Sequence, residues 1–148
     1  MSRTATVSRD DTLHVRDHCL CLHTQRAARV LARRFDEAFR PLKLTSGQFS
    51  LLMSLNRPEA PALGQVAALL GMDRTTLSAA LKPLERRKLL IVSIDAEDRR
   101  TRRLMLTRSG LTLLARALPI WLEMHAGLDA SLRDPDRLRA DLRVLAES

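Results

Sequence analysis

The fold is decided by one stretch of the chain, residues 63–110, which reads LGQVAALLGMDRTTLSAALKPLERRKLLIVSIDAEDRRTRRLMLTRSG. Its first part, residues 63–70, is a short apolar segment with the spacing of a helix. Gly71 suits a left-handed helix end, and Asp73 suits the N-cap of a second helix over residues 74–87. Two helices joined by a tight turn that contains glycine are typical of a helix-turn-helix.

The pattern changes after Lys88. Residues 89–94 are apolar and β-branched, and residues 102–107 alternate, with Leu104 and Leu106 on one face. The residues between these two segments are polar and charged, so the sequence predicts a β-hairpin with a charged tip. A helix-turn-helix that is followed at once by a basic hairpin indicates a winged helix.

Helical patterns flank this stretch on both sides. A helix is predicted from residue 11 to residue 42, and the capping box Thr45-Ser46-Gly47-Gln48 opens a further short helix. Thr107 is expected to cap a long helix over residues 108–132, and Asp134-Pro135 starts a last helix that ends near residue 146. The sequence thus predicts one domain over residues 1–148, mainly α-helical with a small β-hairpin wing. Its winged-helix lobe covers about residues 45–107.

Positive charge is concentrated in the predicted winged helix. The chain carries 25 Lys and Arg against 17 Asp and Glu, a net charge of +8, and residues 74–108 hold ten basic and four acidic residues, a net +6. Such a surface attracts polyanions, and aromatic residues, only 3% of the chain, are too scarce for a single-strand binder that stacks bases. The sequence favours double-stranded DNA as the partner. The alternative is a basic helical module that binds RNA or another protein without operator specificity.

The helix predicted over residues 74–87 has one face for the core and one for DNA. Leu77, Leu81 and Leu84 share the apolar face. The opposite face is polar, basic and small at its centre, so it can approach base edges, bond to them through hydroxyls and neutralise phosphates. In the first turn the helix dipole also favours phosphate. The predicted DNA-binding residues of this helix are Arg74, Thr75, Thr76, Ser78, Lys82 and Arg86.

The hairpin supplies a second group of predicted DNA contacts, namely Asp98, Arg99, Arg100 and Arg102. Arginines this close on an exposed loop repel one another without a partner, and a narrow minor groove accepts an inserted arginine. Asp98 cannot favour DNA directly. We expect its carboxylate to pair with the guanidinium of Arg100 and to hold that side chain towards the minor groove.

In their order, these motifs resemble the MarR family of bacterial transcriptional regulators. The resemblance covers about residues 19–132 and rests on LGMDRTTLS at residues 70–78, DxxDRR at residues 95–100 and LTxxG at residues 106–110. It implies a homodimer paired through the helices of about residues 11–44 and 108–148. It also implies that the recognition helix enters the major groove of a pseudo-palindromic operator and that Arg100 reaches the minor groove. Lys88 departs from the family pattern, because glycine is frequent at that position.

The same resemblance implies a regulator, usually a repressor of nearby genes, that a small phenolic ligand, a metal or an oxidant releases from DNA. No cofactor is expected, and the sequence motifs of common enzymes are absent. The start of the chain shows no secretory signal, and no apolar run approaches the roughly 18 residues of a membrane span. We therefore expect a cytoplasmic protein without a membrane partner.

The two cysteines, Cys19 and Cys21, leave three interpretations open. They pack as small apolar side chains, or they sense oxidants, as a cysteine early in the first helix does in peroxide-sensing members of the family. Those members bond this cysteine through tyrosines, and the chain has none. Residues two apart on a helix point roughly 200° apart, so a disulfide between subunits fits better than one within the helix. The third interpretation is metal binding. A continuous helix would place four residues of metal-ligand type on one face, namely Asp11, His14, His18 and Cys21.

Overall fold

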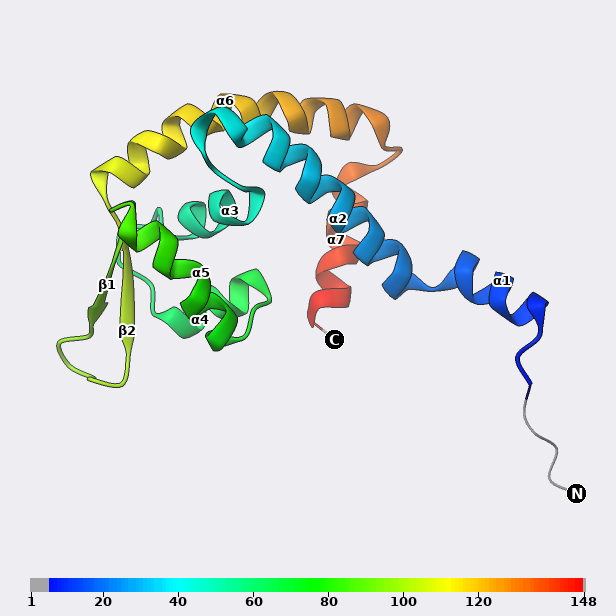
Figure 1. Cartoon of the computed structure of the whole chain (residues 1–148), viewed down its shortest axis with the longest axis horizontal. Helices are drawn as coiled ribbons and strands as arrows, with labels where there is room; N and C mark the ends of the chain where they lie inside the picture. Colours follow the sequence, from blue (N-terminus) through cyan, green and yellow to red (C-terminus); the bar gives the residue numbers. More distant parts are fainter. Residues whose placement is uncertain (1–5, 148) are drawn as a thin grey trace, which may run out of the picture.

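The computed structural model describes residues 6–147, which form helices and one two-stranded antiparallel sheet. In chain order the elements are α1 (Arg9–His18), α2 (Leu20–Phe39), η1 (Arg40–Leu42), α3 (Ser46–Ser54), α4 (Leu63–Leu70), α5 (Arg74–Arg86), β1 (Leu90–Ile94), β2 (Arg102–Leu106), α6 (Arg108–Ser131) and α7 (Pro135–Glu147). Figure 1 shows a lobe of α3, α4, α5 and the hairpin, with the long helices α2 and α6 above it and α1 extending away. Within residues 6–147, none of the helices combines the length and the apolarity that crossing a bilayer requires.

The predicted helix starts are confirmed where a polar side chain caps them. Thr45 Oγ1 accepts the N–H of Gln48 at 3.2 Å, and Gln48 Oε1 accepts the N–H of Thr45 at 3.1 Å, which is the predicted capping box. Asp73 and Thr107 cap α5 and α6, and the carboxylate of Asp134 accepts a backbone N–H at the start of α7. Each cap of this kind stabilises a helix by about 0.5–2 kcal/mol.

The helix predicted over residues 11–42 is interrupted at one residue. Cys19 has an extended conformation (φ −73°, ψ 106°) that ends α1 and begins α2, and its Sγ accepts the N–H of Leu22 at 3.4 Å. α1 also begins before residue 11, because Ser8 forms a capping box with Asp11. The prediction of a continuous helix is therefore wrong, and the side chains before and after Cys19 do not form one helical row.

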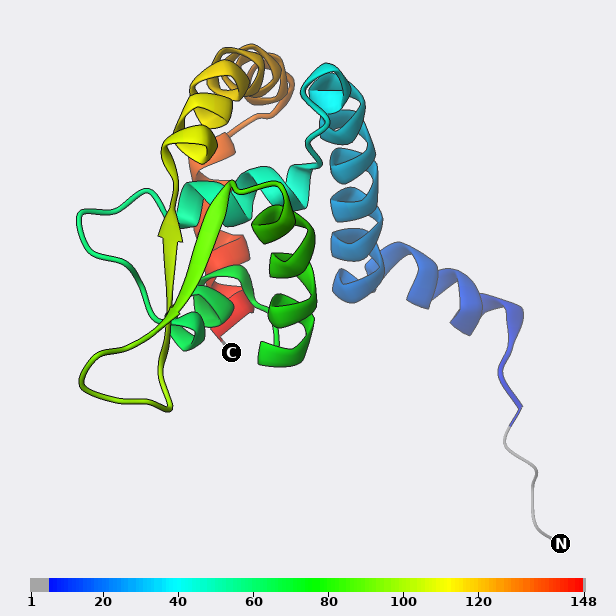
Figure 2. The same cartoon turned by 60° about the vertical axis from the view of Figure 1, so that its left-hand side comes forward.

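One apolar core joins the lobe to the long helices. Phe39 of α2 stacks on Phe49 of α3, with ring centroids 4.9 Å apart. The largest fully buried side chains are Phe39, Leu51, Leu52, Val66, Leu77, Leu84, Leu90 and Leu104. α5 and the two strands thus contribute to the same core, and Figure 2 shows α5 running beside the hairpin. Because its apolar face is used in this packing, α5 turns its polar face outwards.

The start of α6 is packed directly against the turn that follows α5. Lys88 adopts φ 58°, a left-handed conformation that glycine takes at less cost. Thr107 Oγ1 donates to the carbonyl oxygen of Lys88 at 2.7 Å, and the Thr107 N–H donates to that of Leu89 at 3.1 Å. A Cβ built on Gly110 would lie 2.2 Å from the Leu89 carbonyl oxygen. The glycine of the LTxxG motif is therefore required for this close approach.

We expect Gly110→Ala to destabilise the protein by at least about 1–3 kcal/mol, because backbone atoms must move to admit the methyl group. Gly127→Ala is the control, because a Cβ at Gly127 of the same helix meets nothing within 4 Å. Alanine at that position should stabilise the helix by up to about 1 kcal/mol. Thermal unfolding followed by circular dichroism measures both changes, and equal Tm values for the two variants would contradict the role assigned to Gly110.

Candidate nucleic-acid interface

α5 presents a polar face along the side of the lobe that carries the hairpin tip. Leu77, Leu81 and Leu84 are buried, which confirms the predicted core face of this helix. On the other face Thr75 is exposed and Ser78 is half-buried. The N-terminal half of α5 lies on the same side of the lobe as the hairpin tip, whereas its C-terminal end lies at the hairpin base beside the start of α6 (Figure 1).

Asp73 holds the first turn of α5 in place. Its Oδ1 accepts the backbone N–H of Thr76 at 2.7 Å, and its Oδ2 accepts the hydroxyl of Thr76 at 3.0 Å. The bond from the Thr76 N–H is the largest cause that lowers the pKa of Asp73 below its ordinary value. The hydroxyl proton of Thr76 is thus used within the cap. Arg74 and Thr75, which are exposed in the same turn, remain available to a ligand.

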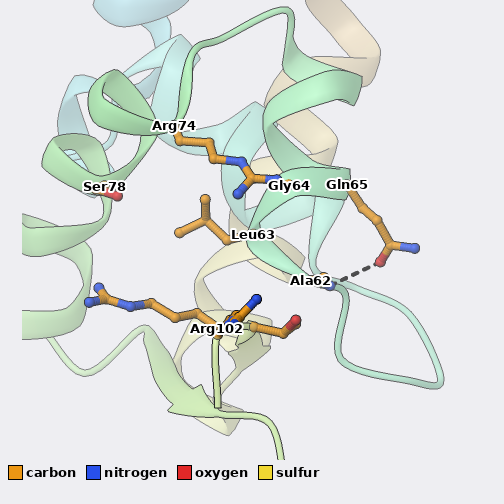
Figure 3. A pocket seen from close by; sticks show the side chains of 9 residues that line it. Ala62, Leu63, Gly64, Gln65, Arg74, Ser78 and Arg102 are labelled. Carbon is orange, nitrogen blue, oxygen red and sulfur yellow. Dashed lines mark hydrogen bonds between the residues drawn. The ribbon is translucent and has the colours of Figure 1, made fainter. Parts of the chain in front are cut away.

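Three arginines line a cleft between α4, α5 and the hairpin, which we call the basic cleft (Figure 3). Its volume is about 510 Å³. The lining residues are Ala62, Leu63, Gly64, Gln65, Arg74, Ser78, Arg100, Thr101 and Arg102. None of these lining residues is acidic, so the positive charge is not neutralised inside the cleft. The structure therefore brings together four of the predicted contact residues, Arg74, Ser78, Arg100 and Arg102.

The contribution of α4 to the basic cleft was not predicted from the sequence. Gln65 Oε1 accepts the N–H of Ala62 at 2.9 Å, so the helix start is capped by a glutamine rather than by a polar N-cap residue. The usual signal of a helix start is therefore missing here. One residue could have indicated that α4 contributes to the cleft. Gly64 stands in the first turn of this short helix although glycine is a poor helix former.

Two aspartates shape the hairpin tip through hydrogen bonds to the loop itself. Asp95 Oδ2 accepts the N–H of Asp98 at 3.1 Å. Asp98 Oδ1 accepts the backbone N–H of Arg100 at 3.0 Å, and its Oδ2 accepts the hydroxyl of Thr101 at 3.1 Å. The predicted ion pair between Asp98 and the guanidinium of Arg100 is therefore wrong. An aspartate side chain readily bonds the backbone two residues ahead, and this local bond takes the carboxylate instead.

Arg103 anchors the hairpin near its tip, because it is paired with Ser93, one residue pair from the tip-side end of the strands. Its Nε donates to Asp95 Oδ1 at 3.2 Å, and this bond is the largest cause that lowers the pKa of Asp95 below its ordinary value. The N–H of Leu104 donates to the carbonyl oxygen of Pro61 at 3.0 Å, which ties the hairpin to the loop before α4. By contrast, the other arginines of the hairpin have no acidic partner within residues 6–147; they are Arg99, Arg100 and Arg102.

Lys82 and Arg86 lie outside the basic cleft. Both side chains are exposed on α5, and Arg86 stands in its last turn. The helical rise places Arg86 about 18 Å along the axis from Arg74. Arg86 thus belongs to the end of α5 that lies at the hairpin base, away from the tip.

The predicted metal row is not formed. The carboxylate of Asp11 accepts the N–H and the hydroxyl of Ser8, and the rings of His14 and His18 stack with centroids 4.3 Å apart. Cys21 lies beyond the interruption at Cys19. In the part of the chain that the structure describes, no group of three or more His, Cys, Asp or Glu residues could hold a metal ion.

Both thiols are free, and neither belongs to the apolar core of the single chain. Cys19 is half-buried at the break, where its sulfur caps α2. Cys21 is exposed, and its sulfur accepts a hydrogen bond from Gln25 Nε2 at 3.0 Å. Packing within one chain therefore does not account for this pair of cysteines.

Comparison with known proteins finds the same fold together with the same sequence pattern. Residues 44–101, which include most of the basic cleft and the hairpin tip, match the sequence model of the MarR family. The chain is 37% identical to the M. tuberculosis transcriptional regulator MosR in a crystal structure with DNA; the match covers 88% of this chain and 95% of that one, with a TM-score of 0.81.

Two further crystal structures are similar over the same elements. A second structure of M. tuberculosis MosR is 36% identical and covers 88% of this chain and 95% of that chain, with a TM-score of 0.76. The transcriptional repressor CouR, bound to a 23-mer DNA duplex, is 29% identical and covers 97% of this chain and 98% of that chain, with a TM-score of 0.73.

If the basic cleft and the hairpin tip bind DNA, Asp98→Ala should weaken the binding of a DNA duplex by about 2- to 10-fold, because the two hydrogen bonds that the Asp98 carboxylate accepts within the tip can no longer form. Asp98→Asn is the matched variant, since its amide oxygen still accepts the Arg100 N–H and its amide nitrogen can donate to Thr101. We expect near-normal affinity for Asp98→Asn in electrophoretic titrations at one salt concentration. Tighter binding by Asp98→Ala would show that only net charge matters at the tip.

Proposed function

Because the chain belongs to the MarR family, we propose that it is a homodimeric regulator of transcription that binds a pseudo-palindromic operator in double-stranded DNA. One observation carries the proposal: the basic cleft and the polar face of α5 lie on the side of the lobe that carries the hairpin tip. The family consists of transcriptional regulators rather than enzymes. In this role the protein represses nearby genes until an effector releases it, and it works at the chromosome in the cytoplasm.

The docking mode follows from the orientation of α5. A recognition helix contacts base edges with its N-terminal residues, and the major groove is about 12 Å wide, enough for one helix. The N-terminal half of α5 holds Thr75 and Ser78, to which we assign sequence reading. Arg74 and Lys82 contact phosphates on either side of the groove. Thr76 supports the helix cap, and Arg86 contacts the phosphate backbone at the far margin of the groove.

The hairpin contacts the adjacent minor groove. Arg100 enters this groove, where the negative potential is enhanced when the groove is narrow. Arg99 and Arg102 bind the flanking phosphates, and Asp98 keeps the tip in shape. The absence of an acidic partner for these arginines within residues 6–147 supports the assignment, because a guanidinium that is already paired binds phosphate less well.

The homodimer is supported by apolar side chains that the terminal helices expose. They include Leu22, Val30 and Leu31 of α2, Leu118 and Leu122 of α6, and Leu138 and Leu142 of α7. Soluble proteins rarely expose so many apolar side chains on neighbouring helices without a partner that covers them. A second copy, paired through about residues 11–44 and 108–148, would cover them. A two-fold dimer presents two α5 helices to two half-sites, which explains a pseudo-palindromic operator.

Substitutions on α5 should separate sequence reading from phosphate binding. Thr75→Ala or Ser78→Ala should change which sequences are bound. Lys82→Ala should weaken the binding of all duplexes by about the same factor. It should also reduce the slope of log K against log salt concentration by about one for each phosphate that a subunit no longer neutralises. Selection of bound fragments from the source genome supplies the operator for titrations against operator, random duplex and single-stranded RNA.

Two results would contradict the proposal. If all three variants bind like the unaltered protein, the polar face of α5 is not the reading face. If single-stranded RNA binds as tightly as the selected operator at both of two salt concentrations, the alternative of a basic RNA-binding module is correct.

For the effector, we infer that an oxidant of the peroxide class acts on Cys19 and Cys21. The thiolate of one cysteine attacks the O–O bond, which releases an alcohol or water and leaves a sulfenic acid. The second thiol attacks that sulfur, expels water and forms a disulfide. When the sulfur of Cys19 enters the disulfide, it is drawn away from the N–H of Leu22, whose hydrogen bond it accepts at the start of α2. The helix that carries apolar side chains of the proposed dimer is thereby loosened.

Treatment with hydrogen peroxide should lower operator affinity and reduce the protein mass by two hydrogens for each disulfide. A non-reducing gel tells a disulfide between subunits from one within a chain. Cys19→Ser and Cys21→Ser should each prevent disulfide formation with the other cysteine, and a reductant should restore the affinity of the oxidised protein. Peroxide-dependent release that persists in the double serine variant would rule out these cysteines as the sensor.

A further inference from the structure

Gly64, the second residue of α4, lies directly beneath the guanidinium of Arg74. A Cβ built on Gly64 would be 2.9 Å from Arg74 Nη2, 3.5 Å from Cζ and 3.7 Å from Nε. Figure 3 shows the Arg74 side chain reaching from α5 across the basic cleft to Gly64. The missing side chain of Gly64 is therefore the space that the guanidinium occupies.

Nothing else in the described chain explains a glycine at this position. The φ of Gly64 is not in the left-handed region, in contrast to Gly71. In an α-helix glycine is less stable than alanine by up to about 1 kcal/mol, so the helix itself gains nothing from Gly64. Gly47 occupies the same second position in α3, yet a Cβ there meets nothing within 4 Å. Only at Gly64 does the absent methyl group make room for a charged side chain.

The Arg74 guanidinium rests in a place that is electrostatically unfavourable without an anion. It has no acidic partner within residues 6–147, and the first turn of α4 contains no acidic residue. The N-terminal end of a helix carries partial positive charge, which repels a cation and attracts an anion. Arg100 and Arg102 line the same cleft. A single phosphate group would relieve all of these repulsions at once.

We propose that Gly64 is a positioning residue: its lack of a side chain holds the Arg74 guanidinium over the first turn of α4, where it binds one DNA backbone phosphate together with Arg102 of the hairpin. This inference rests on the proposed function and adds to it a residue that does not itself bind DNA. Its effect on binding passes through Arg74.

Gly64→Ala moves the guanidinium without disturbing the fold. The atom that the new methyl group meets is the end of a long flexible side chain, so Arg74 can turn away at little cost. Helix α4 should be as stable as before or more stable, because alanine is the better helix former. The variant therefore separates the position of Arg74 from the stability of the protein.

The test measures affinity for a random-sequence DNA duplex, because a phosphate contact does not depend on base sequence. The full-length variants are Gly64→Ala, Arg74→Ala, the double variant, and Gly47→Ala as the matched control. Arg74→Ala should weaken binding about tenfold. Gly64→Ala should weaken it at least about threefold and flatten the salt plot by about one for each subunit. Gly47→Ala should bind like the unaltered protein, and the double variant should bind like Arg74→Ala alone.

Two additional readouts keep a structural role apart from the proposed one. The Tm of Gly64→Ala should be unchanged or raised. The second readout is the NMR resonance of the Arg74 Nε–H, which is assigned by its absence from the spectrum of Arg74→Ala. Without DNA, this resonance should shift in Gly64→Ala and should not shift in Gly47→Ala.

Equal affinity of Gly64→Ala and the unaltered protein would overturn the inference. The inference would also be overturned if Gly64→Ala weakened binding by the same factor in the unaltered protein and in Arg74→Ala. Gly64 would then act through its own close approach to DNA and not through Arg74. Failure of the unaltered protein to bind the duplex would instead contradict the proposed function, so the two failures are distinguishable.

Discussion

The carbonyl groups of Lys88 and Leu89 hold the start of α6 against the end of α5, and the rest of the structure depends on this junction. Thr107 bonds to both carbonyls, through its hydroxyl and through its N–H. Because Gly110 has no side chain, the backbone of α6 can lie against the backbone of Leu89. The helix assigned to DNA reading is therefore attached to the long helix assigned to the dimer by short hydrogen bonds rather than by a flexible linker. A change in the angle between the terminal helices of the two subunits would be passed directly to α5.

The hairpin depends on a second set of fixed contacts. Leu104 is bonded to the loop before α4, and Arg103 is bonded to Asp95. These contacts keep the arginines of the hairpin beside the N-terminal half of α5. The basic cleft consequently collects positive charge from three elements that are separate in the sequence, and no acidic side chain lines it. Such concentrated charge is costly without a polyanion, and it favours rapid association with DNA.

The sequence predicted the helix starts and the hairpin because the relevant signals are local. Thr45, Asp73 and Thr107 each bond a backbone N–H three residues ahead, so the residue type and its position suffice. The interruption at Cys19 was not predicted, because neither glycine nor proline marks it and cysteine is an unusual cap. The predicted role of Asp98 is wrong because the sequence alone does not distinguish a carboxylate that bonds a nearby guanidinium from one that bonds a backbone N–H. The pairing of Gly64 with Arg74 arises from the angle between α4 and α5, which no local pattern contains.

In the proposed complex, two winged-helix lobes of one dimer read two half-sites with α5 in the major groove and the hairpin in the minor groove. Hydroxyl-radical footprinting of the full-length protein on its selected operator tests this most directly. Such a dimer should give two symmetric regions of protection whose centres lie about one helical turn or a multiple of it apart, each extended by protection of the flanking minor groove. Protection of a single unsymmetric region, or the absence of minor-groove protection beside the half-sites, would contradict it.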